Sequence, residues 1–136
     1  MSQFIKSYQA QVGINHVPAY QVSGRPFASG SIDATVSGGV KIEFPYVTRW
    51  IYVVNHGNED CRIGYSQNGV LGSNYLRIGK EAGSEGTQHT VRLEVKVSEI
   101  WLSGSNVDVM AGLTTIPISR VSGSTGPSFS GSAGVG

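Results

Sequence analysis

The chain has 136 residues, a length that suits one domain able to bury roughly two thirds of its unfolded surface without a metal or a disulfide. Charged residues make up 14%, the formal net charge is +1, and 19 residues are glycine. Lysines and arginines are spread without clustering, which argues against nucleic-acid binding because that requires a concentrated positive face. With no run of helix-favouring residues, the composition predicts an all-β protein.

The single cysteine, Cys61, allows no disulfide within the chain. The first residues, Met-Ser-Gln-Phe-Ile-Lys, lack the apolar core of a signal peptide. The most apolar run is too short for a membrane span. We therefore expect a protein that assembles in the cell interior and has no membrane partner.

Residues 1–19 are polar and show no regular hydrophobic period. The bulky apolar residues at the beginning of this segment are Phe4, Ile5 and Tyr8. This segment is expected to be an N-terminal arm. It is either a loose terminus or an extended segment that uses these three side chains as anchors on a neighbouring subunit.

The stretch 41–55, KIEFPYVTRWIYVVN, is expected to lie at the centre of the fold. Its second part, from Trp50 to Val54, is β-branched and aromatic without alternation, which predicts a strand covered on both faces. Pro45 separates the two parts and is expected to mark a bend or a crossing between sheets. Before this stretch, the pattern predicts a short strand at 20–22, a turn at 23–26 and a longer strand at 27–36.

The rest of the chain alternates between short strands and turn signals. Predicted strands lie at 61–65, 74–78, 90–97, 99–103 and 107–113, and loops at 55–60, 66–73, 79–86 and 104–106. Eight or nine strands with turns every 8 to 12 residues predict an antiparallel sandwich or barrel.

The low-complexity end of the chain is rich in Gly and Ser, with Pro127 and Phe129 as its bulky residues. We predict a β-sandwich domain at 20–118 between an N-terminal arm at 1–19 and a C-terminal arm at 119–136. A Gly/Ser segment loses much conformational entropy when it becomes ordered. An ordered one must therefore be held against something, which favours arms that bind neighbours.

A search for catalytic or metal-binding patterns gives few candidates. The three histidines are far apart and lack partners at metal-ligand spacing. His56 and Cys61 could form a nucleophile pair, but Cys61 begins a strand where a small side chain packs well, and no oxyanion-hole loop is evident. Glu94 lies between Arg92 and Lys96, which favours ordinary ion pairing over a catalytic carboxylate pair. We therefore expect no catalytic residue, no metal ligand and no cofactor.

Several aromatic residues could instead line a sugar-binding groove. They are Trp50, Tyr52, Tyr65, Tyr75 and Trp101. Most lie within predicted strands, where packing on a sheet face is the usual role.

Five segments, in the order in which they occur, carry a resemblance to a known class of protein. They are YQVSGRPF at 20–27, IEFPYVTRWI at 42–51, RIGYSQNGV at 62–70, RLEVK at 92–96 and AGLT at 111–114. These segments resemble small single jelly-roll proteins of virus particles that serve as pentons, minor capsid proteins or decoration proteins. The resemblance spans residues 20–116 and implies a two-sheet antiparallel sandwich, single jelly-roll-like with about eight strands, whose loops and arms bind other copies or a major capsid protein.

The sequence therefore predicts a non-enzymatic structural component of a virus particle that stabilises, caps or decorates the capsid. It is expected in the virion, as a homo-oligomer within the particle. The expected interface residues lie in the two arms and the loop between two strands: Phe4, Ile5, Tyr8, Tyr65, Asn68, Tyr75, Pro127 and Phe129. One alternative is a carbohydrate- or receptor-binding module of a viral fibre or tail, with Trp50, Tyr65 and Tyr75 as stacking residues. Another is a small hydrolase that uses Cys61 and His56.

Overall fold

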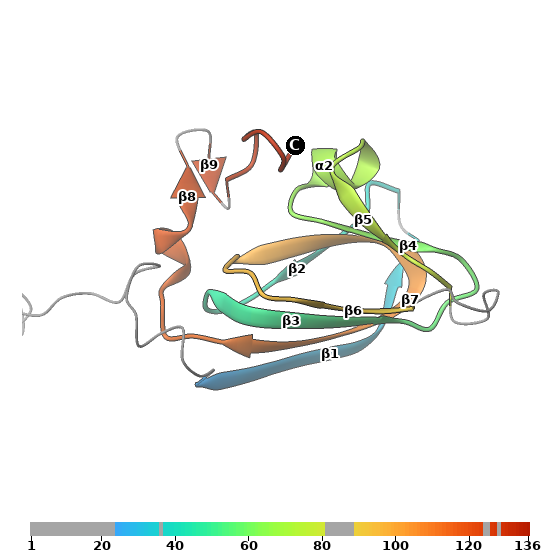
Figure 1. Ribbon diagram of the computed structural model, residues 1–136, viewed down its shortest axis with the longest axis horizontal. Helices are drawn as coiled ribbons and strands as arrows, with labels where there is room; N and C mark the ends of the chain where they lie inside the picture. The colour runs from blue at the N-terminus through green and yellow to red at the C-terminus, as the bar shows by residue number, and fades with distance from the viewer. Residues whose placement is uncertain (1–23, 36, 81–88, 124–125, 128) are drawn as a thin grey trace, which may run out of the picture.

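The computed structural model describes residues 24–35, 37–80, 89–123, 126–127 and 129–136. Within these residues the regular elements are nine strands and one short helix, with one 3-10 turn, so the protein is all-β as predicted (Figure 1). The strands are β1 (Arg25–Ala34), β2 (Val40–Glu43), β3 (Thr48–Asn55), β4 (Cys61–Gly64), β5 (Tyr75–Ile78), β6 (Thr90–Leu93), β7 (Glu99–Leu113), β8 (Ser122–Gly123) and β9 (Gly126–Pro127); the helix is α2 (Gln67–Leu71) and the 3-10 turn is η2 (Ile118–Arg120).

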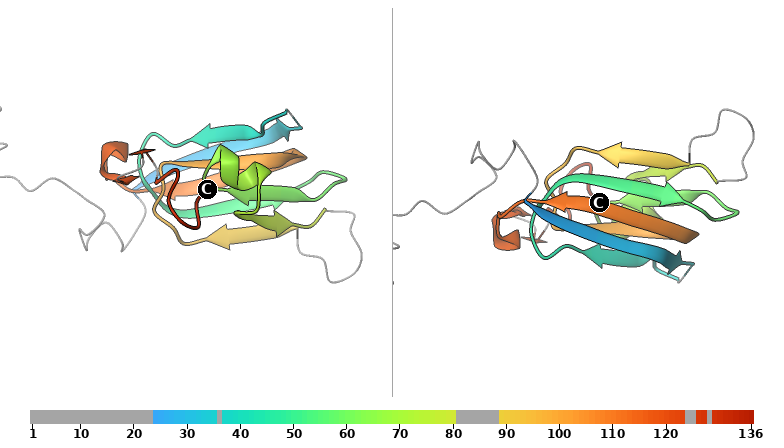
Figure 2. Two further views of the ribbon diagram at one scale, coloured as in Figure 1. Left: turned by 90° about the horizontal axis from the view of Figure 1, so that it is seen from above. Right: turned by 90° about the horizontal axis from the view of Figure 1, so that it is seen from below.

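The long strand β7 organises the fold. Its first half pairs with β2 on one side and β4 on the other, and β5 extends that layer beyond β4. Its second half pairs with β1 and β3, and β6 extends that layer beyond β3. We call the layer β2-β7-β4-β5 sheet B and the layer β1-β7-β3-β6 sheet A. The two sheets face each other as the layers of a sandwich joined by the bend in β7 (Figures 1 and 2).

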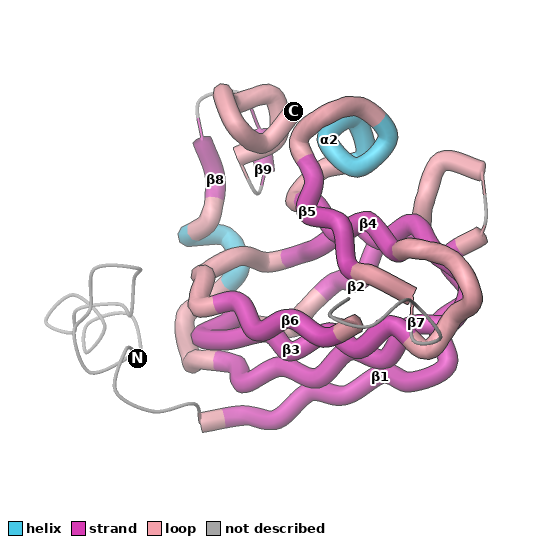
Figure 3. The backbone as a smooth tube through the Cα atoms, turned by 45° about the vertical axis from the view of Figure 1, so that its right-hand side comes forward, coloured by secondary structure: helices cyan, strands magenta, loops and turns pink. Residues whose placement is uncertain are grey.

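The strand order is that of a single jelly roll. With the two halves of β7 counted separately, each sheet has four antiparallel strands, giving the eight strands of this fold. The chain winds between the layers, since β1 and β3 lie in sheet A while β2 and β4 lie in sheet B (Figure 3). This confirms the predicted sandwich.

The turn predicted at 104–106 is wrong, because these residues lie inside β7, where it passes from one sheet to the other. Gly104 permits this passage: a Cβ there would lie 3.0 Å from the side chain of Cys61 and 3.3 Å from its Cα. The Gly-Ser-Asn composition thus marks a bend within a strand rather than a connection between two strands.

The stretch 41–55 is only partly as predicted. Pro45 does lie in the crossing between sheets, since β2 belongs to sheet B and β3 to sheet A. The centre of each sheet, however, includes β7. Full coverage of both faces of β3 is also wrong, because Tyr52 is 39% exposed while Ile51 and Val53 are fully buried. The non-alternating apolar sequence thus produces one core face and one half-covered outer face.

The loop expected at 66–73 is wrong in part, because its residues 67–71 form the short helix α2. Ser66 caps α2 by accepting a hydrogen bond from the backbone N–H of Gly69, at 2.9 Å. The Asn68-Gly69 pair, which suggested a turn between strands, lies within this helix. Neighbouring boundaries also shift: β1 includes Arg25 and Pro26, and β6 ends at Leu93, four residues before the predicted end. The strand predicted at 20–22 lies outside the described residues.

The main core lies between the sheets and contains Phe44, Ile51, Ile100, Leu102 and Leu113 among its largest side chains. Phe27 and Phe44 meet edge to face with ring centroids 5.0 Å apart. A second, smaller cluster of Val47, Ile116 and Val121 lies beyond the end of the sandwich, and Phe129 packs against it.

Candidate interaction surfaces

The outer face of sheet A carries a row of exposed apolar side chains. Tyr52 pairs with Met110, and Met110 pairs with Ala28, so these three lie side by side across β3, β7 and β1. Met110 is 53% exposed. Together with Val54 they border a shallow depression of about 400 Å³. We call this surface, with the half-buried Trp50 beside it, the outer A face.

A charged group borders the outer A face at β6. Arg92 pairs with Tyr52 across the sheet, and its guanidinium carbon lies 5.3 Å from the ring centroid of Trp50. Glu94 lies 2.7 Å from Arg92 and 2.6 Å from Arg49, which confirms that it takes part in ordinary ion pairs. The hydrogen bond from Arg92 is the largest cause of the lowered pKa of Glu94; desolvation opposes it, and the charges of Arg92 and Arg49 add to the lowering.

Asp108 and His56 form a second polar group at the opposite end of the outer A face, and Asp108 stabilises an irregular part of β1. Asp108 accepts a hydrogen bond from the backbone N–H of Ser31 at 2.7 Å, and its other oxygen lies 3.0 Å from His56 Nε2. Ser31 has a φ of 53° where the register of β1 shifts. The carboxylate therefore holds an irregular strand in place, and the surface has an apolar centre between charged ends.

The outer face of sheet B is different, because its aromatic rings already have polar partners. The indole N–H of Trp101 donates to Glu99 at 2.7 Å, and Lys41 lies 5.9 Å from the ring centroid of Trp101. The guanidinium of Arg62 lies 4.3 Å from the ring centroid of Tyr75. The aromatic rings on this side are therefore partly covered by charged side chains.

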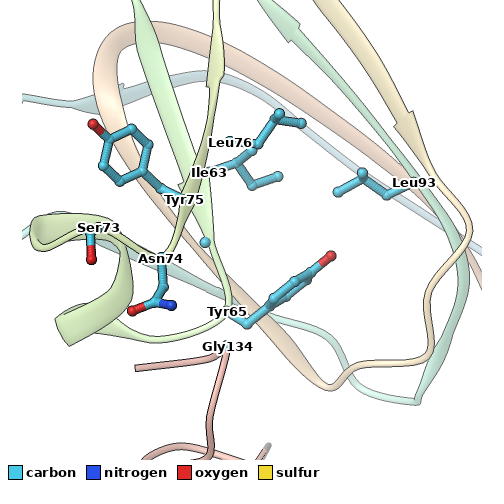
Figure 4. Close-up of a pocket in the computed structure, with 9 residues that line it drawn as sticks. Ile63, Tyr65, Ser73, Asn74, Tyr75, Leu76, Leu93 and Gly134 are labelled. Atoms are coloured by element: carbon cyan, nitrogen blue, oxygen red, sulfur yellow. The ribbon is translucent and has the colours of Figure 1, made fainter.

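A third surface is the seam between β5 and β6, the outermost strands on one side of the sandwich. A cavity of about 340 Å³ lies there, and the side chains of Ile63, Tyr65, Leu76 and Leu93 converge on it from the two sheets (Figure 4). Burial raises the pKa of the Tyr65 hydroxyl. Leu76 pairs with Ile63 and so belongs to the inward-facing set, yet it is 46% exposed.

The seam is closed at its other end by Asn55, which is fully buried. Its amide nitrogen donates to the carbonyl oxygens of Glu59 at 2.9 Å and Gly79 at 3.1 Å, and its backbone N–H donates to His89 at 2.8 Å. One residue of β3 thus holds the end of β5 and the beginning of β6 together.

The C-terminal residues fold back onto the protein's own domain. The Ser66 hydroxyl lies 2.7 Å from the carbonyl oxygen of Val135 and 2.8 Å from that of Gly136, and it can donate to one of them at a time. Gly69 lies so close to this segment that a Cβ there would be 2.3 Å from the Val135 oxygen. The end of the tail is therefore held by its own chain, and the binding of this arm to a neighbouring subunit stays a prediction.

The expected interface residues are widely separated. Tyr65 lines the seam, Asn68 is exposed on α2, and Tyr75 is half-buried on β5 against Arg62. Pro127 lies in β9, and Phe129 packs on the second cluster instead of extending away from the domain. Phe4, Ile5 and Tyr8 lie outside the described residues. The outer A face, centred on Tyr52 and Met110, was not singled out as an interface; its signal was the lack of alternation in the sequence of β3.

The alternative sites do not assemble. Trp50 lies on sheet A whereas Tyr65 and Tyr75 border sheet B, so these rings form no common sugar-stacking platform. Cys61 is fully buried, and burial raises the pKa of its thiol to about 11, so little thiolate exists at neutral pH. Among the described residues, no group of three His, Cys, Asp or Glu is placed to hold a metal ion.

Comparison of the chain with protein families, with curated proteins and with solved structures finds no match. In the described part of the chain, no helix has the length and apolar character needed to span a membrane.

Proposed function

We propose that the protein is a structural component of a virus particle that stabilises, caps or decorates the capsid through contacts with other copies and with a major capsid protein. The observation that carries the proposal is the outer A face, where Tyr52, Met110 and Ala28 form an exposed apolar row across three strands. An apolar patch bordered by polar residues is typical of a surface that binds another protein.

The fold and the sequence segments support this reading together. The resemblance carried by residues 20–116 implies a single jelly roll, and the strand order of sheets A and B is that of a jelly roll. Because a fold alone does not determine function, the proposal depends on the surface rather than on the fold. The ion pairs of Glu94 at one border and the Asp108 group at the other supply polar contacts that can set the orientation of a partner.

The size of the outer A face indicates that it does not act alone. Four strands about 4.8 Å apart, of which β3 has 8 residues and β6 only 4, cover at most roughly 15 by 26 Å, or about 400 Å². Two such faces packed together would bury about 800 Å², below the 1,200–2,000 Å² of a typical specific interface. A stable assembly would therefore need a second contact in addition to this face.

The test is self-association of Met110→Lys compared with Leu71→Lys. Both side chains are about half exposed, but Leu71 lies on α2, away from the outer A face. We expect sedimentation velocity to show oligomers in the unmodified protein and in Leu71→Lys, with at least tenfold weaker association in Met110→Lys. Equal association of the two variants, both folded by circular dichroism, would refute the role of this face.

A further inference from the structure

The seam between β5 and β6 has the features of a site that accepts an extended peptide. In the described part of the chain, no strand pairs with the outer edge of β5 or of β6. Such edges present backbone N–H and C=O groups that can pair with another strand. Leu76 and Leu93 stand at the two edges, and both have the inward parity of core residues, as their pairing with Ile63 and Ile51 shows.

The exposure of Leu76 indicates that this part of the core is incomplete. A side chain that faces the core is normally buried, whereas Leu76 is 46% exposed and Leu93 is half-buried beside a cavity of about 340 Å³. That volume is sufficient for an aromatic or large aliphatic side chain. An added strand would insert such side chains at every second residue and hydrogen-bond to an edge through its backbone.

The chain itself contains a segment with the required chemistry. In an extended conformation, Phe4 and Tyr8 would share one face and Ile5 would lie on the other. Phe4 and Tyr8 would therefore supply two aromatic side chains to the inward face, with Lys6 between them. Residues 9–23 connect these anchors to Gly24, which directly precedes β1. The N–H of Gly24 donates to the carbonyl oxygen of Leu113, the last residue of β7.

The length of that connection allows the segment to reach a second copy. Fifteen residues span up to about 50 Å when extended. The chain joins sheet A at β1, the edge opposite β6, and the four strands of the sheet are only about 15 Å wide. A domain of this size is roughly 35 Å across. The connection is thus long enough to reach the seam of an adjacent subunit. The second intersubunit contact that the small outer A face needs favours that seam over the chain's own.

We propose that the seam between β5 and β6 binds the N-terminal segment of a second copy of this chain, with Phe4 and Tyr8 entering beside Leu76 and Leu93. The proposal rests on the proposed function and names the second contact that the outer A face requires. The bound segment would add a strand to the sandwich and cover Leu76.

The experiment is disulfide trapping between two differently substituted chains. Full-length Phe4→Cys or Tyr8→Cys protein is mixed with Leu76→Cys protein under mild oxidation, and linked peptides are identified by mass spectrometry. We expect a cross-link between Leu76→Cys and at least one of these two, and at least fivefold less with Ile5→Cys or when Leu71→Cys replaces Leu76→Cys. The native Cys61 is too buried to compete. Leu93→Cys serves as a second acceptor if Leu76→Cys does not fold.

Three outcomes would overturn the proposal. A cross-link that forms only within one chain of the Phe4→Cys, Leu76→Cys double variant would place the segment in its own seam. Equal linkage to Leu71→Cys would mean random collision, and no linkage would mean that the seam does not receive the segment. If Met110→Lys weakens association while trapping fails, the proposed function survives and only this inference is lost. If trapping succeeds while Met110→Lys associates normally, the seam contact holds but the outer A face does not.

Discussion

Replacement of Asn55 by Ala tests how the seam is closed. This side chain is fully buried and makes three hydrogen bonds of ordinary length: to the carbonyl oxygens of Glu59 (2.9 Å) and Gly79 (3.1 Å), and from the N–H of Gly57 (3.0 Å). A fourth contact, to the Ile78 carbonyl at 3.5 Å, is at the distance limit and is not counted. At roughly 1 kcal/mol each, the three bonds predict a loss of about 3 kcal/mol in the free energy of unfolding.

The assay is urea-induced and thermal unfolding at a low, fixed protein concentration, so that association does not contribute. A loss of 3 kcal/mol corresponds to a melting temperature lower by about 10 °C for a domain of this size. The matched control is Asn58→Ala in the same loop, where the side chain is exposed and a change within about 0.5 kcal/mol is expected. A loss below about 1 kcal/mol for Asn55→Ala would refute the reasoning, because water would then be replacing the amide.

Three further predictions concern single side chains. The Ser105 hydroxyl is buried and has no hydrogen-bond partner among the described residues, so Ser105→Ala should raise the free energy of unfolding by about 1 kcal/mol in urea titrations; a loss of that size would show a hidden partner. With its pKa raised to about 11, Cys61 should resist iodoacetamide at pH 8 in the folded protein and react fully in denaturant, as read by intact mass; rapid labelling of the folded protein would contradict its burial. The pKa of Glu94 is lowered from its ordinary value of 4.5. Its interaction with Arg92 therefore stabilises the fold above pH 4.5, and this contribution is lost as the pH falls through the lowered pKa. The free energy of unfolding should exceed that of Glu94→Gln near neutral pH, and this difference should shrink in acid. An advantage that is constant with pH would show that the charge of Glu94 is irrelevant.

Much of the fold could be predicted because hydrophobic alternation and turn residues are local signals. The all-β class, the crossing at Pro45 and the core parity of Val91 and Leu93 all follow from such signals. The bend at Gly104 was mistaken for a turn, since the same small residues serve both purposes and only the partner strands distinguish them. α2 was missed because five residues carry too little periodicity, although Ser66 three residues before Gly69 fits an N-cap.

The interaction surfaces were harder to predict because they depend on which strands become neighbours. Tyr52, Met110 and Ala28 are far apart in the sequence, and only the register of β1, β7 and β3 brings them together. The same holds for Leu76 and Leu93, whose shared cavity results from the winding of the two sheets. The C-terminal tail was expected to bind a neighbour because entropy requires some partner; composition alone does not say that Ser66 of the same chain provides it.

The most direct test of the central claim, that the outer A face is covered by another subunit, is the oxidation rate of Met110 as a function of protein concentration. Met1 and Met110 are the only methionines, and Met110 is 53% exposed in the isolated subunit. Peroxide treatment followed by peptide mass analysis should show rapid oxidation of Met110 in dilute protein and at least fivefold slower oxidation at concentrations where light scattering detects oligomers, with an added free methionine peptide as the reference for peroxide reactivity. Equal rates in the dilute and assembled protein, or no assembly at any concentration, would contradict the claim.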